Sequence, residues 1–181
     1  MAPEHHPDLT HEHPTISVPD LAEVAYESEL TWSAERPETL VVCCSDGRLQ
    51  RSIDYFLDEH LGVFYYDRLY APGGPGALSD KGSQFMRADH YRRDLKFLLD
   101  AHSFEQVILI FHGAAEDGPA HSDCAHYKTM MPDKPRQEIV ARQKEDFEDV
   151  LLYLKGLRNS LDVRGYRAEA TSEKHLRFVK I

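Results

Sequence analysis

Apolar residues are distributed along the chain in two kinds of pattern, short nearly continuous runs and longer runs with helical spacing. Segments 39–45, 63–71 and 105–112 are short and rich in β-branched or aromatic residues, which predicts strands. The first lacks polar alternation and the third is the most apolar segment, as is typical of strands buried in a parallel sheet. Two closing strands are predicted at 163–172 and 175–181, as a hairpin at the sheet edge.

Helical spacing of apolar residues recurs in four segments. The predicted helices cover residues 20–34, 49–61, 83–102 and 136–158. The Gly/Pro-rich segment 72–78 is expected to be a loop that is neither helix nor central strand. The alternation of strands and helices predicts an α/β fold with a mainly parallel central sheet, helices on both faces and closing edge strands.

One folded domain is expected, preceded by an arm. Residues 1–18 are polar, aperiodic and rich in His and Pro, which predicts a flexible arm. Residues 19–181 have no internal repeat and no composition break, and their length suits a single domain. We therefore expect a single α/β domain over 19–181.

Charge and composition exclude several classes of protein. The net charge of -10 argues against a nucleic-acid partner, which needs clustered Lys and Arg. No run of about 18 apolar residues is present, so no membrane association is expected. The N-terminal residues lack the apolar core of a signal peptide, and the three cysteines are few and odd in number. We therefore expect a cytoplasmic protein.

The first candidate for chemistry lies at the end of the first predicted strand. Cys44 occupies the strand end, where a thiolate is well placed to bind a borderline metal. Asp46 and Arg48 follow two residues apart, so Arg48 can pair with the Asp46 carboxylate and keep it ionised. Taken alone, this segment is better explained by a buried structural cysteine and a salt bridge in a turn.

The second candidate is the pair His121 and Cys124, whose spacing places both side chains on one face of a helix or turn. Together with Cys44 they would give three zinc ligands, and catalytic zinc typically has three protein ligands and one open position. Water would take the fourth position, or Asp46 could ligate. The alternative is a metal-free α/β domain in which the cysteines belong to the core.

Two other histidines have more than one interpretation. His112 ends the third predicted strand and is interpreted as a packing or supporting histidine rather than a ligand. His126 could serve as a proton shuttle, although a plain surface histidine is the better interpretation. Cys43 is interpreted as a core residue because neighbours in a strand point to opposite sides.

These motifs resemble those of the β-class carbonic anhydrases. Cys44-Ser45-Asp46-Gly47-Arg48 is similar to the family's Cys-x-Asp-x-Arg motif, and His121-x-x-Cys124 is similar to its second zinc motif. Residues 70–74 resemble the segment after the family's second strand, and 165–181 resemble its closing strand pair. The resemblance implies Zn²⁺ held by Cys44, His121 and Cys124, with Asp46 and Arg48 as the catalytic dyad. In some family members the matching Asp is the fourth ligand.

The choice of His121 follows from the spacing of the second motif. Counting from His112, the cysteine position of the motif would be Ala115, which cannot bind a metal. We therefore interpret residues 113–120 as an insertion that separates the strand end from the motif.

The function implied by the resemblance is reversible hydration of CO₂ to bicarbonate by zinc-bound hydroxide, which is the reaction of a lyase, carbonate dehydratase. Family members are usually built from dimers, so a homodimer or higher homo-oligomer is expected. Two alternatives stay open from the sequence. One is a carbonic-anhydrase-like zinc protein with a structural or regulatory role, and the other is a zinc hydrolase of a different small electrophile, such as CS₂ or COS.

Overall fold

The computed structural model describes residues 28–29, 32–81 and 85–181 of the 181-residue chain. The chain divides into residues 1–34 and a compact unit of residues 35–181, and the second unit is described below. The predicted arm at 1–18 and most of the predicted helix at 20–34 fall outside the described residues.

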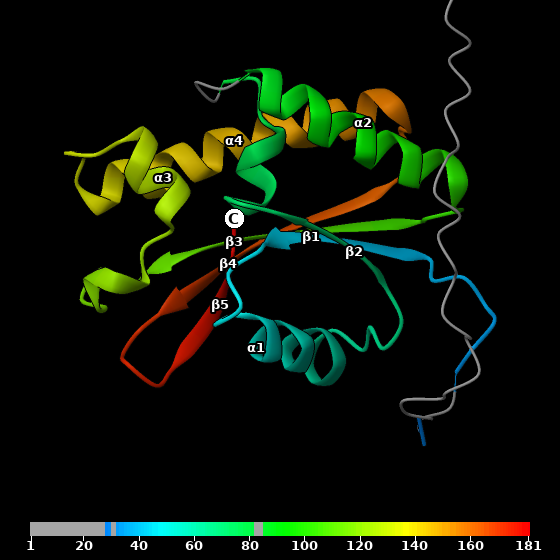
Figure 1. The fold of residues 1–181 in the computed structure, drawn as a ribbon, viewed down its shortest axis with the longest axis horizontal. Helices are drawn as coiled ribbons and strands as arrows, with labels where there is room; N and C mark the ends of the chain where they lie inside the picture. The colour runs from blue at the N-terminus through cyan, green and yellow to red at the C-terminus, as the bar shows by residue number, and fades with distance from the viewer. Residues whose placement is uncertain (1–27, 30–31, 82–84) are drawn as a thin grey trace, which may run out of the picture. The chain divides into compact units, whose positions relative to one another are not determined.

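The compact unit is built on a five-stranded sheet with the strand order β2-β1-β3-β4-β5 (Figure 1). The strands are β1 (Thr39–Cys44), β2 (Asp67–Ala71), β3 (Gln106–Ala114), β4 (Asp162–Ala170) and β5 (Leu176–Lys180). Pairs β1–β2, β1–β3 and β3–β4 are parallel, and only β5 runs antiparallel, against β4. The predicted parallel sheet and the predicted edge hairpin are thereby confirmed.

Helices cover both faces of this sheet, as predicted. Figure 1 shows α1 (Gln50–Tyr55) on one face and α2 (Phe85–Ala101) and α4 (Arg136–Leu157) on the other. The helix predicted at 49–61 consists of α1 followed directly by a π-helical turn, η1 (Phe56–His60). None of the helices in the described parts of the chain is both long and apolar enough to cross a membrane.

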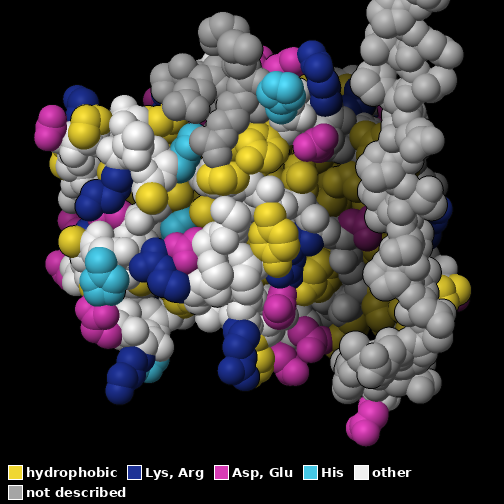
Figure 2. Space-filling view, viewed as in Figure 1, with side chains coloured by type: hydrophobic (Ala, Val, Ile, Leu, Met, Phe, Trp, Pro, Cys, Tyr) yellow, Lys and Arg dark blue, Asp and Glu magenta, His cyan; other side chains and the backbone are white. Residues whose placement is uncertain are grey.

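The core lies between the central strands and the two helical layers. Every residue of β1 is buried, and β3 is buried from Val107 to Ala114. Ile53 and Leu57 pack onto the sheet from the α1 side, while Val150 and Leu154 are the innermost apolar residues of α4. Burial of both sheet faces explains why β1 and β3 have continuous apolar sequences. At the surface, acidic and basic side chains of the described residues are interspersed on the face shown in Figure 2.

The segment 72–78 was predicted to be a loop without helix, but most of it is helical. Residues Gly74–Leu78 form a buried 3₁₀ helix, η2. A 3₁₀ helix this short needs few hydrogen bonds. Pro75 lies in its first turn, where the missing N–H of proline loses no hydrogen bond of the helix. Gly73 and Gly74 lead into it with φ of 98° and 61°, conformations that favour glycine.

The segment 113–120 was predicted to be an insertion after the third strand, but part of it belongs to that strand. Its first two residues extend β3, and Gly113 and Ala114 pair with Glu169 and Ala170 of β4. The chain then turns back through a 3₁₀ helix, η3 (Ala120–Ser122), into a short helix, α3 (Ala125–Met130), that the sequence analysis did not predict.

Candidate metal centre

Three elements bring potential metal ligands together at the carboxyl edge of the sheet. Cys44 is the last residue of β1, and His112 lies near the end of the neighbouring strand β3. Cys124 comes directly before α3, after the chain has turned back through η3. Ligands of open α/β sheets commonly sit at this edge, where parallel strands end together.

The three side chains form a compact, buried group. One ligand atom from each of Cys44, His112 and Cys124 lies within 4.8 Å of the others, and the residues are 6%, 3% and 3% exposed. The Nε2 atom of His112 is buried and has no hydrogen-bond partner among the described residues. A buried polar nitrogen without a partner is costly, which points to a ligand that satisfies it.

The donor set fits zinc. Two thiolates and one imidazole are preferred zinc ligands, and Zn–S and Zn–N distances of about 2.3 Å and 2.0–2.1 Å place donors roughly 3.5–3.8 Å apart in a tetrahedron. The observed separations are compatible with that size. The soft thiolates make a hard cation such as Mg²⁺ or Ca²⁺ a poor match. Three protein donors leave one coordination position for another ligand.

The hydrogen bond between Cys44 and Cys124 shifts the pKa values of the two thiols in opposite directions. The hydrogen bond from Cys124, supported by His112 and by the Gly73 N–H, lowers the pKa of Cys44 to about 3. The same Cys44 hydrogen bond, together with burial, raises the pKa of Cys124 above its usual range. The Gly73 N–H lies 3.4 Å from the Cys44 sulfur. One thiolate is thus preformed for a cation.

The group found among the described residues contains His112, whereas the sequence analysis expected His121 as the histidine ligand. The His121 side chain is 62% exposed, and its Nε2 atom lies 3.1 Å from Glu173 Oε2. The physical reason is the length of β3, which continues through Ala114 and buries His112 beside the end of β1. The Nε2 atom of His112 has no hydrogen-bond partner among the described residues, which differs from the satisfied packing histidine expected from the sequence.

The Asp46–Arg48 pair lies next to this group in the chain, in the loop after β1. Arg48 Nε lies 2.9 Å from Asp46 Oδ1, and Arg48 Nη2 lies 2.5 Å from Oδ2. The Arg48 backbone N–H also donates to Oδ1, at 3.1 Å. The Arg48 hydrogen bonds lower the pKa of Asp46, and the same carboxylate raises the pKa of Arg48. Asp46 is therefore a carboxylate with both oxygens held, and it lies outside the group of three potential ligands found among the described residues.

Two glutamines that the sequence analysis did not single out position the site. Gln50, in the first turn of α1, donates to the backbone carbonyls of Cys44 and Asp46 at 3.0 and 3.1 Å. Gln143, buried on α4, donates to the His112 carbonyl at 2.9 Å and accepts from the buried Arg167. No periodicity or spacing marks either residue, because both act on partners in other elements.

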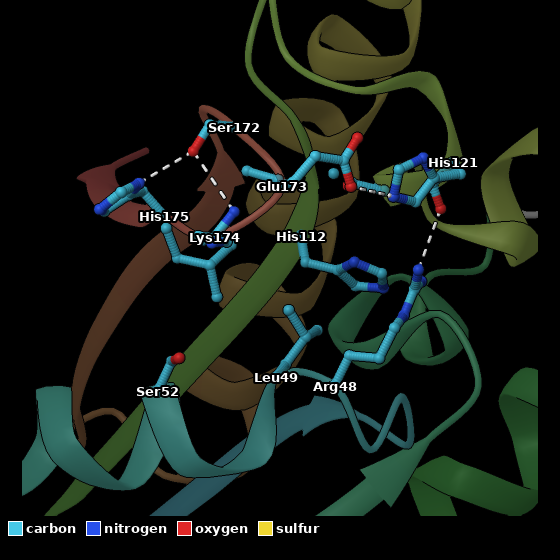
Figure 3. Close-up of a pocket in the computed structure, with 13 residues that line it drawn as sticks. Arg48, Leu49, Ser52, His112, His121, Ser172, Glu173, Lys174 and His175 are labelled. Atoms are coloured by element: carbon cyan, nitrogen blue, oxygen red, sulfur yellow. Dashed lines mark hydrogen bonds and ion pairs between the residues drawn. The ribbon is translucent and has the colours of Figure 1, made fainter.

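A pocket of about 220 Å³ opens beside the group (Figure 3). It is reached by His112 from β3, Arg48 from the loop after β1 and His121 from η3. Its far wall is the turn between β4 and β5, and part of its lining is apolar, from Leu49 and Leu176. The pocket therefore gives solvent access to His112 and to Arg48 of the Asp46–Arg48 pair.

The remaining candidates from the sequence lie away from this pocket. Cys43 is fully buried, as expected of a core residue, and burial raises its pKa to about 12. The His126 ring packs edge-on against Tyr127, and its carbon atoms lie so close to Gly73 that a side chain there would collide with them. His126 is thus partly buried, which differs from a plain surface histidine.

Comparison with known proteins adds a distant likeness. A similar solved structure is the crystal structure of beta-carbonic anhydrase isoform I from the protozoan Trichomonas vaginalis. It is 17% identical, with 84% of this chain and 87% of that chain covered, at a TM-score of 0.40. No family model matches the chain. The search of curated proteins found no match. At this identity and TM-score the likeness does not indicate a function.

Proposed function

We propose that this chain is a zinc enzyme that catalyses the reversible hydration of CO₂ to bicarbonate. The observation that carries the proposal is the buried group of Cys44, His112 and Cys124, followed in the chain by the paired Asp46 and Arg48. A zinc ion held by these three residues would supply Lewis-acid activation of water at neutral pH.

The role of Asp46 follows from its hydrogen bonds. Arg48 keeps the carboxylate ionised and occupies both of its oxygens, so Asp46 remains a hydrogen-bond acceptor rather than a metal ligand. An ionised carboxylate at this position would accept a hydrogen bond from the attacking water and orient its lone pair toward CO₂. Gln50 fixes the same loop through two backbone carbonyls, which limits the movement of Asp46.

The pocket supports a small substrate. Leu49 and Leu176 give it apolar surface suited to CO₂, while Arg48 and Lys174 add positively charged groups suited to bicarbonate to its lining. The proposed substrate and product are CO₂ and bicarbonate, and the expected homo-oligomer and cytoplasmic location stay predictions from the sequence.

The test is stopped-flow CO₂ hydration with zinc content measured on the same samples, comparing the wild type with Asp46→Asn. We expect one zinc per chain in both proteins, fast hydration in the wild type and a loss of about 10²-fold or more in the variant, as for removal of a general acid–base group. Wild-type rates in the variant would remove Asp46 from the mechanism. Zinc without hydration in the wild type would refute the proposal and favour a non-catalytic zinc protein or, with turnover of CS₂ or COS, a hydrolase of those gases.

A further inference from the structure

Cys124, the last member of the metal group in the chain, lies directly before a very short helix. Helix α3 has six residues, and isolated helices shorter than about 12 residues are only marginally stable in water. Its orientation therefore has to come from contacts with the rest of the protein. Because the proposed function makes Cys124 a zinc ligand, these contacts also decide where a ligand sulfur lies.

The side chain of Tyr127 makes a buried contact between α3 and α4 (Figure 1). It is fully buried, and its hydroxyl donates a hydrogen bond of 2.7 Å to Oδ2 of Asp146 on α4. Burial and the Asp146 carboxylate raise the pKa of Tyr127 well above its usual range, so the hydroxyl stays a donor. A hydrogen bond to a carboxylate is also stronger than one between two neutral groups.

Asp146 is itself held in place on α4. Its side chain is fully buried, and Oδ1 accepts a hydrogen bond of 2.9 Å from Nε of Arg142, one turn earlier in the helix. One carboxylate oxygen is thus bonded within α4 and the other is bonded to α3. Loss of the Tyr127 hydroxyl would remove the bond to Oδ2, and a buried charged group that loses a partner is costly. The pair therefore fixes α3 against α4.

Tyr127 also fits closely against the 3₁₀ helix η2. A Cβ at Gly76 would lie 2.0 Å from the Tyr127 hydroxyl oxygen, so the end of the ring fills the space that a side chain would need there. At the start of η2, the Gly73 N–H lies 3.4 Å from the Cys44 sulfur. Tyr127 is thus enclosed between α4 and the segment that contacts Cys44.

The backbone of Tyr127 reaches the Cys124 sulfur. The hydrogen bond with Cys44 and burial raise the pKa of Cys124, while the backbone N–H groups of Tyr127 and His126 lower it by bonding to the sulfur. Tyr127 therefore bonds the sulfur through its N–H and α4 through its hydroxyl. We propose that Tyr127 and Asp146 are positioning residues that hold Cys124 in place to bind zinc.

The test is the zinc affinity of the wild type, Tyr127→Phe and Tyr153→Phe, measured by competition with a chromophoric chelator. Tyr153→Phe is the matched control, because it also removes a tyrosine hydroxyl that bonds α4 to another element, here the Arg92 carbonyl of α2 at 3.3 Å. We expect zinc to bind roughly 10- to 100-fold more weakly to Tyr127→Phe, as on loss of a residue that supports a ligand, and within about twofold of the wild type to Tyr153→Phe. Equal affinities in all three proteins, or equal losses in both variants, would overturn the proposal.

A double-mutant cycle tests whether the two residues act as a pair. Asp146→Leu removes the acceptor of the Tyr127 hydroxyl and keeps a side chain of similar size, so it should also weaken zinc binding. Tyr127→Phe combined with Asp146→Leu should then bind zinc no more weakly than the weaker single variant. Losses that add in the double variant would show that the two side chains act separately, which would overturn the pair.

The spectrum of Co²⁺-substituted protein separates positioning of the sulfur from stabilisation of the fold. Charge transfer from thiolate to Co²⁺ gives a near-ultraviolet band that responds to the geometry and hydrogen bonds of the sulfur. The band should shift in Tyr127→Phe and stay unchanged in Tyr153→Phe. A lower Tm in Tyr127→Phe with the affinity and band of the wild type would assign Tyr127 to fold stability alone and overturn the proposal.

These measurements are independent of CO₂ hydration. Zinc bound by a wild type that does not hydrate CO₂ would refute the proposed function, and the affinities would still decide the role of Tyr127 and Asp146. Wild-type affinity in Tyr127→Phe, with hydration by the wild type, would refute the positioning role alone. A wild type that binds no zinc would refute both.

Discussion

Arg48 donates a hydrogen bond of 3.0 Å from Nη1 to the backbone carbonyl of His121. The same guanidinium holds both carboxylate oxygens of Asp46. Arg48 thereby connects the loop after β1 with η3, the turn that brings Cys124 back to Cys44. A single planar side chain positions the proposed catalytic carboxylate and one wall of the pocket.

Arg48→Lys should reduce hydration without loss of zinc. A lysine ammonium is a point charge and cannot bond both carboxylate oxygens and the carbonyl in one plane. We expect kcat/KM to fall roughly tenfold to a hundredfold, the equivalent of about 1.5–3 kcal/mol for a charged hydrogen bond. Stopped-flow assays with zinc analysis check this. Arg51→Lys, an exposed position on α1 away from the pair, is the matched control, and equal rates in both variants would contradict the role of Arg48.

Gly74→Ala should destabilise the fold at the metal centre. Gly74 has φ of 61°, and a Cβ there would lie 3.0 Å from the Cys44 nitrogen and 3.1 Å from the Ile110 oxygen. The left-handed backbone alone costs an alanine roughly 1–2 kcal/mol, so Tm should drop by about 3–8 °C. Gly47→Ala is the control, because a Cβ at Gly47 meets nothing within 4 Å. Calorimetry showing equal Tm values for the two variants would contradict this packing.

Zinc binding should release about one proton per ion near pH 7. Cys44, with its pKa lowered to about 3, is already a thiolate in the metal-free protein, whereas Cys124, with its pKa raised, still holds its proton. Because that proton has to leave, zinc affinity should rise with pH and weaken in acid. Isothermal titration calorimetry in buffers of different ionisation enthalpy measures the proton count. Release of two protons would show that both thiols are protonated before zinc binds.

Much of the fold could be predicted because buried elements have recognisable apolar patterns in the sequence. Strands β1 and β3 are buried on both faces and therefore have continuous apolar runs, and α4 has inward-facing residues at helical spacing. The 3₁₀ helix at Gly74–Leu78 was missed because its hydrogen bonds are few and its composition is that of a loop.

The metal centre could be predicted only in part, since two of its three residues are set by long-range geometry. Cys44 was evident at a strand end, but the choice between His112 and His121 depended on where β3 stops. The spacing His-x-x-Cys favoured His121, whereas the structure turns the chain back so that Cys124 meets a histidine twelve residues earlier. The signal that pointed to His112 was its place at the end of the most apolar strand, at the sheet edge where Cys44 lies.

The zinc content of His112→Ala and His121→Ala shows which histidine is the metal ligand. Both proteins should be purified without a tag and compared with the wild type by metal analysis, with circular dichroism confirming that each is folded. We expect one zinc per chain in the wild type and in His121→Ala, and loss of zinc in His112→Ala. Zinc retained in His112→Ala and lost in His121→Ala would contradict this expectation.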